Sequence, residues 1–219
     1  MAKEKYHHGD LKNALIEAGI GILSKEGVGA LSLRKVARRA GVSHTAPYAH
    51  YADKQALIAA IAAAGYEKLY ARISGLVQQY RDDPAQQLVE AAWAYMEFAL
   101  HETDHFKITF SGVVEKEKDY PALVEISHQS FRLVIEIVEA CQRAGILPEG
   151  PSDLLAVSVW GLLHGLVSLV LEGQVSHTVL DRFSLKEMLV TSLNLMAQGR
   201  IDPRAAICPF AAEEYTCPS

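Results

Sequence analysis

Apolar residues recur at every third or fourth position in segment after segment of this 219-residue chain, and no segment shows the strict alternation of a strand. In the first segment they are Leu11, Ala14, Leu15, Ala18, Ile22 and Leu23. This spacing places them on one face of an α-helix, whereas a half-buried strand needs a period of two. The sequence therefore predicts an all-α fold.

Capping and breaking residues divide this pattern into separate helices. Asp10, Ser32 and Asp53 each precede an apolar repeat and are predicted N-caps, because their side chains accept hydrogen bonds from the first turn. The expected helices cover about 11–26, 33–40, 44–51, 54–80, 85–101, 104–110, 121–144, 153–171 and 183–198. The periodicity ends near residue 199, so residues 200–219 are expected to form a flexible tail.

The charge of the chain is unevenly distributed along its length. The formal net charge is −5, yet residues 1–54 carry nine Lys and Arg against five Asp and Glu, which gives +4, and residues 55–219 carry −9. A basic N-terminal part on an acidic remainder predicts that residues 1–54 meet a polyanion. We accordingly expect two domains, residues 1–54 and 55–199.

The second and third expected helices are separated by three residues, which is typical of a helix-turn-helix. Val36 and Ala37 form an inner face, and the small Ala37 allows the next helix to approach closely. Gly41 is expected in the left-handed conformation that turns the chain. Val42 is expected to fill the corner and Ser43 to cap the third helix.

Residues 31–57, LSLRKVARRAGVSHTAPYAHYADKQAL, resemble the DNA-binding signature of the tetracycline-repressor (TetR/AcrR) family. The matching pieces are Val36-Ala37, Ala40-Gly41-Val42-Ser43, Tyr48-Ala49-His50-Tyr51 and Lys54 before Leu57; Tyr6-His7-His8-Gly9-Asp10-Leu11 also resembles openings found in this family. The resemblance implies an N-terminal helix-turn-helix head, joined by a long helix to a helical effector-binding and dimerisation domain. It also implies a sequence-specific transcriptional regulator, a repressor that a small molecule releases from its operator.

The resemblance implies DNA-binding roles for eight residues. The set is Arg34, Ser43, His44, Thr45, Ala46, Tyr48, His50 and Lys54. Tyr48, His50 and Lys54 would hold phosphates, and Arg34 has the donor fork that suits guanine. Lys3 and Lys5 would extend along the DNA as an arm.

Neighbouring residues of the head have weaker or different expected roles. Tyr51 is expected in the core, and Arg38 and Arg39 either approach DNA or merely solvate their helix. Pro47 departs from the family's usual aliphatic residue and is expected to alter the third helix.

Two C-terminal helices are the predicted dimer interface, because duplex sites are commonly read as paired half-sites. Helix 153–171 contains Gly161 and Gly165, which permit close helix approach. The stripe on helix 183–198 is Leu185, Met188, Leu189, Ser192, Leu193 and Met196. The alternative is a seam within one chain. Duplex DNA with a palindromic operator, a second copy of the chain and an unidentified effector are the expected partners.

Trp160-Gly161-Leu162-Leu163-His164-Gly165 resembles a Trp-x-x-x-His-Gly element of one branch of TetR-like C-terminal domains. Trp160 and His164 are four residues apart and share a helix face, so they form either an effector contact or a core pair. The predicted effector-binding set is Tyr66, Tyr70, Trp93, Met96, Phe110, Trp160 and His164. Its aromatic side chains predict an apolar or aromatic effector.

A five-residue motif supports a competing hypothesis from another class of protein. His101-Glu102-Thr103-Asp104-His105 matches the H-E-x-x-H pattern of zinc hydrolases, which needs both imidazoles on one helix face and a third ligand. The stretch lies at an expected helix junction with Thr103 as a cap, and His128 lacks the spacing of a third ligand. We therefore expect no metal, no cofactor and no enzymatic activity. A third hypothesis is a non-specific DNA-architectural protein.

The location of the protein is predicted from its N-terminus and its cysteines. The charged start has no apolar stretch behind it, so no signal peptide is expected. Cys141, Cys208 and Cys217 match no common zinc spacing and favour the reducing cytoplasm, with Cys141 in the core. The uncharged run Leu154–Leu171 is long enough for a membrane span, but its serines, its histidine and its acidic flanks favour a buried helix.

Overall fold

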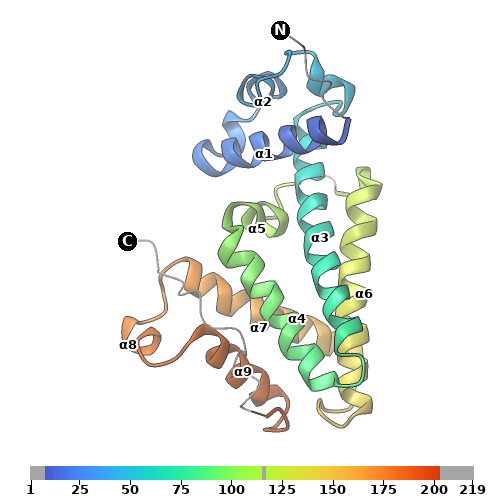
Figure 1. The fold of residues 1–219 in the computed structure, drawn as a ribbon, viewed down its shortest axis with the longest axis vertical. Helices are drawn as coiled ribbons and strands as arrows, with labels where there is room; N and C mark the ends of the chain where they lie inside the picture. The colour runs from blue at the N-terminus through green and yellow to red at the C-terminus, as the bar shows by residue number, and fades with distance from the viewer. Residues whose placement is uncertain (1–7, 115–116, 203–219) are drawn as a thin grey trace. The chain divides into compact units, whose positions relative to one another are not determined.

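The computed structural model describes residues 8–114 and 117–202, and all regular elements in these ranges are helices, as the sequence predicts (Figure 1). The α-helices are α1 (His8–Glu26), α2 (Leu33–Arg39), α3 (Lys54–Gln79), α4 (Pro84–His101), α5 (Thr103–Phe110), α6 (Pro121–Arg143), α7 (Ser152–Leu171), α8 (His177–Leu180) and α9 (Leu185–Met196). The 3₁₀ helices are η1 (Val28–Ala30), η2 (Ala46–Ala49) and η3 (Glu117–Asp119). The predicted arm at Lys3 and Lys5 and the tail cysteines Cys208 and Cys217 lie outside the described residues.

The helices form two compact units. Unit 1 contains the residues up to Ala71 and Glu97–Phe131; unit 2 contains Arg72–Met96 and the residues from Arg132 onward. Helices α3, α4 and α6 each contribute to both units. The proposed boundary at residue 54 coincides with the start of α3, within unit 1, and remains a prediction.

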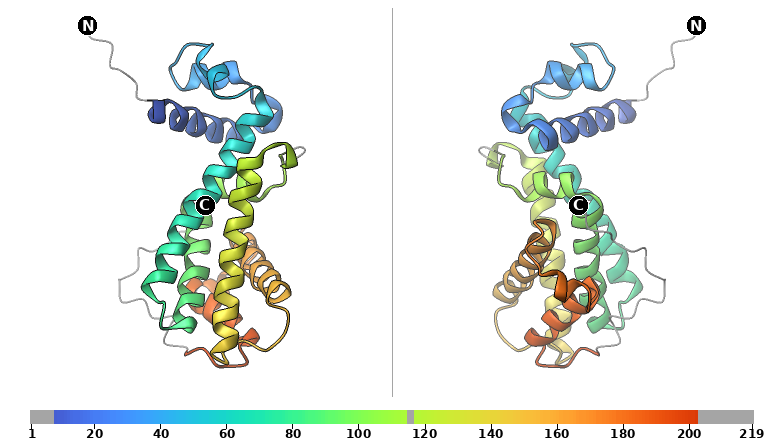
Figure 2. Two further views of the ribbon diagram at one scale, coloured as in Figure 1. Left: turned by 90° about the vertical axis from the view of Figure 1, so that its right-hand side faces the viewer. Right: turned by 90° about the vertical axis from the view of Figure 1, so that its left-hand side faces the viewer.

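Unit 1 has a core in which side chains of α1, α2 and the beginning of α3 pack together with Tyr51 and with Ile108 of α5 (Figure 2). Its fully buried side chains include Leu15, Ile22, Val36, Leu57, Ile58 and Ile61. Helix α1 approaches α3 closely at Gly19, where an added Cβ would lie 2.7 Å from Cδ1 of Ile61. Because these large apolar side chains come from several helices, burial fixes the arrangement of the head without a sheet.

Two of the three predicted N-caps are confirmed. The Ser32 hydroxyl accepts a hydrogen bond from the Lys35 N–H at 3.2 Å, and the Asp53 carboxylate accepts one from the Ala56 N–H at 2.8 Å. The prediction for Asp10 is wrong because α1 begins at His8, so Asp10 lies inside the helix. The apolar repeat that begins at Leu11 therefore marks the start of core packing and not the start of the helix.

Unit 2 is organised around α7, whose buried stripe is Ala156, Val159, Leu163, Val167 and Val170. Helix α9 contacts α7, and its Leu189 and Leu193 are fully buried within the chain. The prediction that these two leucines belong to a dimer interface is therefore wrong, since they already form an intrachain seam. The other members of the predicted stripe are only half-buried.

Polar contacts fix the ends and sides of the unit 2 helices. Ser184 and Glu187 form a capping box at the start of α9. The buried Lys186 ammonium donates to the Glu90 carboxylate of α4 at 2.8 Å. Cys141 is buried, as predicted, and its Sγ lies 3.1 Å from the Pro84 carbonyl oxygen; burial, together with the Asp83 charge, raises the pKa of its thiol to about 12.

Candidate nucleic-acid interface and ligand-binding body

The turn between α2 and η2 has the predicted helix-turn-helix geometry. Gly41 has φ +70°, the left-handed conformation, and the following Val42 N–H donates to the Ala37 carbonyl at 3.0 Å. The Val42 side chain packs against the unit 1 core, which confirms its expected place in the corner. A residue with positive φ directly after a helix ends the helix, and glycine adopts this conformation without a Cβ clash.

The third helix is shorter and tighter than the predicted 44–51 α-helix. It is the 3₁₀ turn η2, in which the Tyr48 N–H donates to Thr45 and the His50 N–H to Pro47, each three residues back. Pro47 has no N–H to offer an α-helical ladder, and it is the buried residue of η2, which packs against α2. Ser43 does not cap this turn as expected, because Thr45 occupies the cap position and the Ser43 hydroxyl lies 3.1 Å from the Thr45 hydroxyl.

The polar residues predicted to meet DNA are exposed on α2, the turn and η2. The exposed side chains are those of Arg34, Ser43, His44, Thr45, Tyr48 and His50, whereas Ala46 and Lys54 are half-buried. Tyr48 exposes 53% of its surface although it is a large aromatic residue. Tyr51 is only 5% exposed, as predicted, and burial raises its pKa to about 12. The segment therefore presents a polar, aromatic-containing surface with its apolar residues turned inward.

The cations of α2 have different surroundings. Lys35 pairs with Glu26 of α1, and the Lys35 hydrogen bond lowers the pKa of the Glu26 carboxyl. The Arg39 guanidinium lies over Gly21 of α1, where an added Cβ would be 2.5 Å from its Nη2. Arg34 is exposed and has no ion-pair partner among the described residues. Of these three cations, Arg34 therefore has the side chain best placed to reach a ligand.

Lys54 stands at the first position of α3, beside the Asp53 cap. Its ammonium donates to the Val28 carbonyl at 3.5 Å, which is long for a hydrogen bond. A phosphate oxygen can therefore take the place of this carbonyl as the acceptor. The Asp53 carboxylate occupies the Ala56 N–H of the same helix end. The α3 N-terminus thus offers one amide fewer to a phosphate, as the predicted Asp53 cap implies.

The predicted effector-binding residues are divided between the two units. Tyr66, Tyr70 and Phe110 belong to unit 1, where the Tyr66 and Phe110 rings meet edge to face with centroids 5.3 Å apart. Trp93, Met96, Trp160 and His164 belong to unit 2, and Met96 is fully buried. Because the seven residues belong to two different units, the single effector site that they would form remains a prediction.

A hydrogen-bond network in unit 2 joins Trp160 and His164 through Tyr95, a residue outside the predicted site. The Trp160 indole N–H donates to the Tyr95 hydroxyl at 3.2 Å, and that oxygen lies 2.8 Å from His164 Nδ1. The Tyr95 hydroxyl accepts the indole hydrogen and can donate its own hydrogen to His164 Nδ1. In the neutral His164 imidazole, the ring hydrogen is then on Nε2. The spacing of Trp160 and His164 predicted that they share a face of α7, but no local pattern indicates Tyr95 of α4 as their partner.

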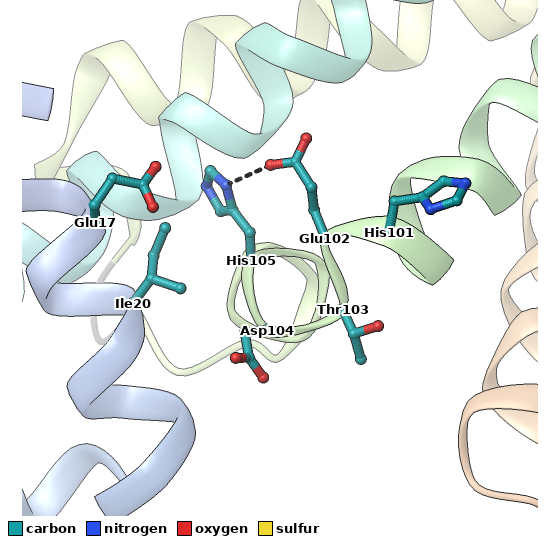
Figure 3. Close-up of a pocket in the computed structure, with 7 residues that line it drawn as sticks. All are labelled: Glu17, Ile20, His101, Glu102, Thr103, Asp104 and His105. Atoms are coloured by element: carbon teal, nitrogen blue, oxygen red, sulfur yellow. Dashed lines mark ion pairs between the residues drawn. The ribbon is translucent and has the colours of Figure 1, made fainter. Parts of the chain in front are cut away.

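The H-E-x-x-H motif does not assemble a metal site. His101 ends α4 and His105 lies within α5, while Glu102 between them has non-helical dihedrals of φ −121° and ψ 46°. The His105 Nε2 lies 2.8 Å from the Ile61 carbonyl, a contact that commits this nitrogen to donation. Figure 3 shows the two imidazoles pointing apart. No group of three metal-ligating side chains occurs among the described residues.

Thr103 has a different role from the predicted cap. Its hydroxyl donates backward to the Ala99 carbonyl at 2.8 Å and to the Leu100 carbonyl at 3.2 Å, the last turn of α4. Glu102, not Thr103, occupies the N-cap position of α5. The helix junction predicted from the sequence is therefore present, but Thr103 stabilises the helix before it.

The fold and this exposed surface define an all-helical protein with an N-terminal helix-turn-helix. Two family models match the chain: residues 15–61 match "Bacterial regulatory proteins, tetR family", and residues 88–193 match "Tetracyclin repressor-like, C-terminal domain". Together they cover more than two thirds of the chain. The chain belongs to the tetracycline-repressor family and is a DNA-binding transcriptional regulator.

One known regulator is similar to this chain in sequence, and solved structures share its fold. YobS, an uncharacterised HTH-type transcriptional regulator of Bacillus subtilis, is 24% identical over 156 residues, which are 71% of this chain and 76% of YobS. A protein of unknown function from Rhodococcus sp. RHA1 has 29% identity and a TM-score of 0.73, over 91% of this chain and all of that one. The regulator FadR of Bacillus subtilis, solved with stearoyl-CoA, has 16% identity and a TM-score of 0.67, over 85% and 98% of the two chains, and shows the same fold.

Proposed function

We propose that this regulator is a cytoplasmic homodimeric repressor that binds a palindromic operator and leaves it when a small apolar or aromatic effector binds. The observation that carries the proposal is the exposed surface of α2, the turn and η2, which combines Arg34 with Tyr48 and His50 while the apolar residues face inward. Regulators of this family are typically non-enzymatic, and nothing in the geometry of the described residues favours the hydrolase hypothesis.

The eight DNA-binding residues divide into positioning and reading groups. Tyr48, His50 and Lys54 hold phosphates, since such contacts set the register without reading sequence. Arg34 reads guanine, because its unpaired guanidinium matches the O6 and N7 acceptors. Ser43, His44, Thr45 and Ala46 lie at the turn and η2, where they contact base edges or adjacent backbone.

A second copy of the chain is proposed to cover the exposed face of α7. Leu154, Val157 and Leu169 expose 64%, 50% and 45% of their surfaces, and Cβ atoms added at Gly161 and Gly165 would meet nothing within 4 Å. These positions follow one another at helical spacing along one face. Helix α7 is the one helix of the described chain long and apolar enough to cross a membrane, but its opposite face packs in the unit 2 core. A helix face that combines exposed leucine and valine side chains with glycines favours close packing against another helix.

An apolar effector is proposed from the aromatic residues of the body. The candidates remain Tyr66, Tyr70, Trp93, Met96, Phe110, Trp160 and His164, to which we add Tyr95 as the residue that orients the last two. The FadR structure with stearoyl-CoA, a ligand with a long apolar acyl chain, supports a fold that can hold an apolar group. Release follows if the effector binds more tightly to the conformation with low DNA affinity.

Selection of genomic fragments by the full-length protein, followed by mobility-shift titration, tests the DNA-binding roles. Lys54→Ala should weaken binding to all DNA sequences to a similar degree. Arg34→Ala should reduce the discrimination between bases at one base pair by about 1–3 kcal/mol. Lys107→Ala removes an exposed α5 cation outside the proposed interface and serves as the charge control. Equal affinity for selected and random duplexes at moderate salt would instead support a non-specific architectural protein.

A further inference from the structure

A cavity of about 310 Å³ within unit 1 is lined by side chains of α1, the end of α4 and α5. Its lining residues are Glu17, Ile20, His101, Glu102, Thr103, Asp104 and His105 (Figure 3). Six of these seven side chains are polar, so the cavity does not resemble an apolar effector pocket. It lies outside every residue predicted to bind the effector.

The cavity carries an excess of negative charge. Glu17, Glu102 and Asp104 each contribute a carboxylate. The Lys68 ammonium donates to Glu102 at 2.6 Å and offsets one of these charges. Glu17 and Asp104 have no ion-pair partner among the residues that the structure describes. Negative charge gathered at a concave surface attracts cations.

His105 supplies an independent sign that a hydrogen-bond donor is missing. The residue is only 3% exposed, its Nε2–H is committed to the Ile61 carbonyl, and its Nδ1 has no hydrogen-bond partner. Nδ1 faces the Glu102 carboxylate at 3.7 Å, a contact that is an ion pair when the imidazole is protonated; in the neutral imidazole Nδ1 is an acceptor without a donor (Figure 3). A buried acceptor without a partner costs about 1–3 kcal/mol.

We propose that this cavity binds a small organic cation through its N–H groups. An ammonium or guanidinium group donates to His105 Nδ1 and to the carboxylates of Glu102 and Glu17, which satisfies the buried imidazole and neutralises part of the charge. Glu17 belongs to α1 of the DNA-binding head and His105 to α5, so one ligand would tie these two helices together. The regulatory part of this inference rests on the proposed function, because a cation that binds one conformation better changes operator affinity.

Calorimetric titration of the full-length protein without DNA, with putrescine as the probe, tests the binding. Putrescine should bind once per chain, and 1,4-butanediol, which has the same chain length but no charge, should not. Glu17→Gln removes one charged hydrogen-bond acceptor from an exposed position and should weaken binding about tenfold. Glu67→Gln, an exposed carboxylate of α3 outside the cavity, should leave binding unchanged.

His105→Gln retains an N–H donor for the Ile61 carbonyl but moves the remaining acceptor, its amide oxygen, away from the position of Nδ1, and it should also abolish most of the binding. If this variant fails to fold, the Glu17→Gln comparison still decides. Equal binding of putrescine and butanediol, or equal losses in Glu17→Gln and Glu67→Gln, would overturn the proposal. Operator binding by the same preparations is measured separately, so a failed cation site is distinguishable from a failed DNA-binding function.

Discussion

Gly65→Ala is predicted to destabilise the protein even though alanine is the better helix former. Gly65 lies in the interior of α3, where a Cβ would overlap the Thr109 hydroxyl oxygen and lie 3.1 Å from both Thr109 Cβ and His105 Nε2. Rotation of the threonine cannot relieve the contact with its own Cβ. The Thr109 hydroxyl and the His105 imidazole also make hydrogen bonds, to the His105 and Ile61 carbonyls, which the displacement would disturb.

The magnitude follows from opposing contributions. Replacing glycine by alanine inside a helix stabilises by about 1 kcal/mol. Overpacking a close contact costs about 1–3 kcal/mol, and weakening two buried hydrogen bonds costs roughly 1 kcal/mol each. The free energy of unfolding should therefore fall by about 2–4 kcal/mol.

Urea unfolding followed by circular dichroism measures the effect, with Gly75→Ala on the same helix as the matched control. A Cβ at Gly75 meets nothing within 4 Å, so this substitution should stabilise by up to about 1 kcal/mol. Thr109→Ala combined with Gly65→Ala should recover part of the loss by removing the overlapping hydroxyl. An increase in stability for Gly65→Ala similar to that for Gly75→Ala would refute the close packing of α3 against α5.

Other substitutions test the buried polar groups. Tyr51→Phe removes a buried hydroxyl without a hydrogen-bond partner and should change stability by less than about 1 kcal/mol at neutral pH. Because burial raises the folded pKa of Tyr51 from 10 to about 12, the native protein loses stability as pH rises through that range, and urea titrations should show a smaller loss in Tyr51→Phe. Lys186→Met removes the ion-pair partner of Glu90, leaving it the Gln86 amide as a donor, and should cost about 3 kcal/mol, whereas Lys186→Met with Glu90→Leu should cost less; an additive loss in this double-mutant cycle would contradict the pairing. Asp53→Ala should cost about 1 kcal/mol through loss of the α3 cap, and an unchanged urea midpoint would argue against that hydrogen bond.

Local rules predicted much of the fold because they act between residues close in the chain. Ser32 and Asp53 cap their helices through the amide three residues on, and Gly41 turns the chain by its own dihedral freedom. The failures are also local and have identifiable causes. Pro47 cannot donate to an α-helical ladder, so the expected third helix contracts to η2, and Ser43 loses the helix that it was expected to cap.

Contacts between distant segments could not be predicted from these rules. Leu189 and Leu193 have the same spacing as a dimer stripe, and only the position of α7 shows that they face their own chain. Tyr95 is 65 residues from Trp160, so no sequence pattern links their side chains. The contact between His105 and Glu102 likewise depends on Ile61, 44 residues from His105, whose carbonyl fixes the orientation of the imidazole.

Footprinting of the full-length protein over the region upstream of its own gene tests the central claim most directly. We expect two protected half-sites whose centres are one helical turn, ~34–36 Å, apart. Protection should shift or weaken in Arg34→Ala but persist in Lys107→Ala. No protection at moderate salt, there or on any fragment recovered by genomic selection, would contradict the assignment of the head as a sequence-specific DNA reader.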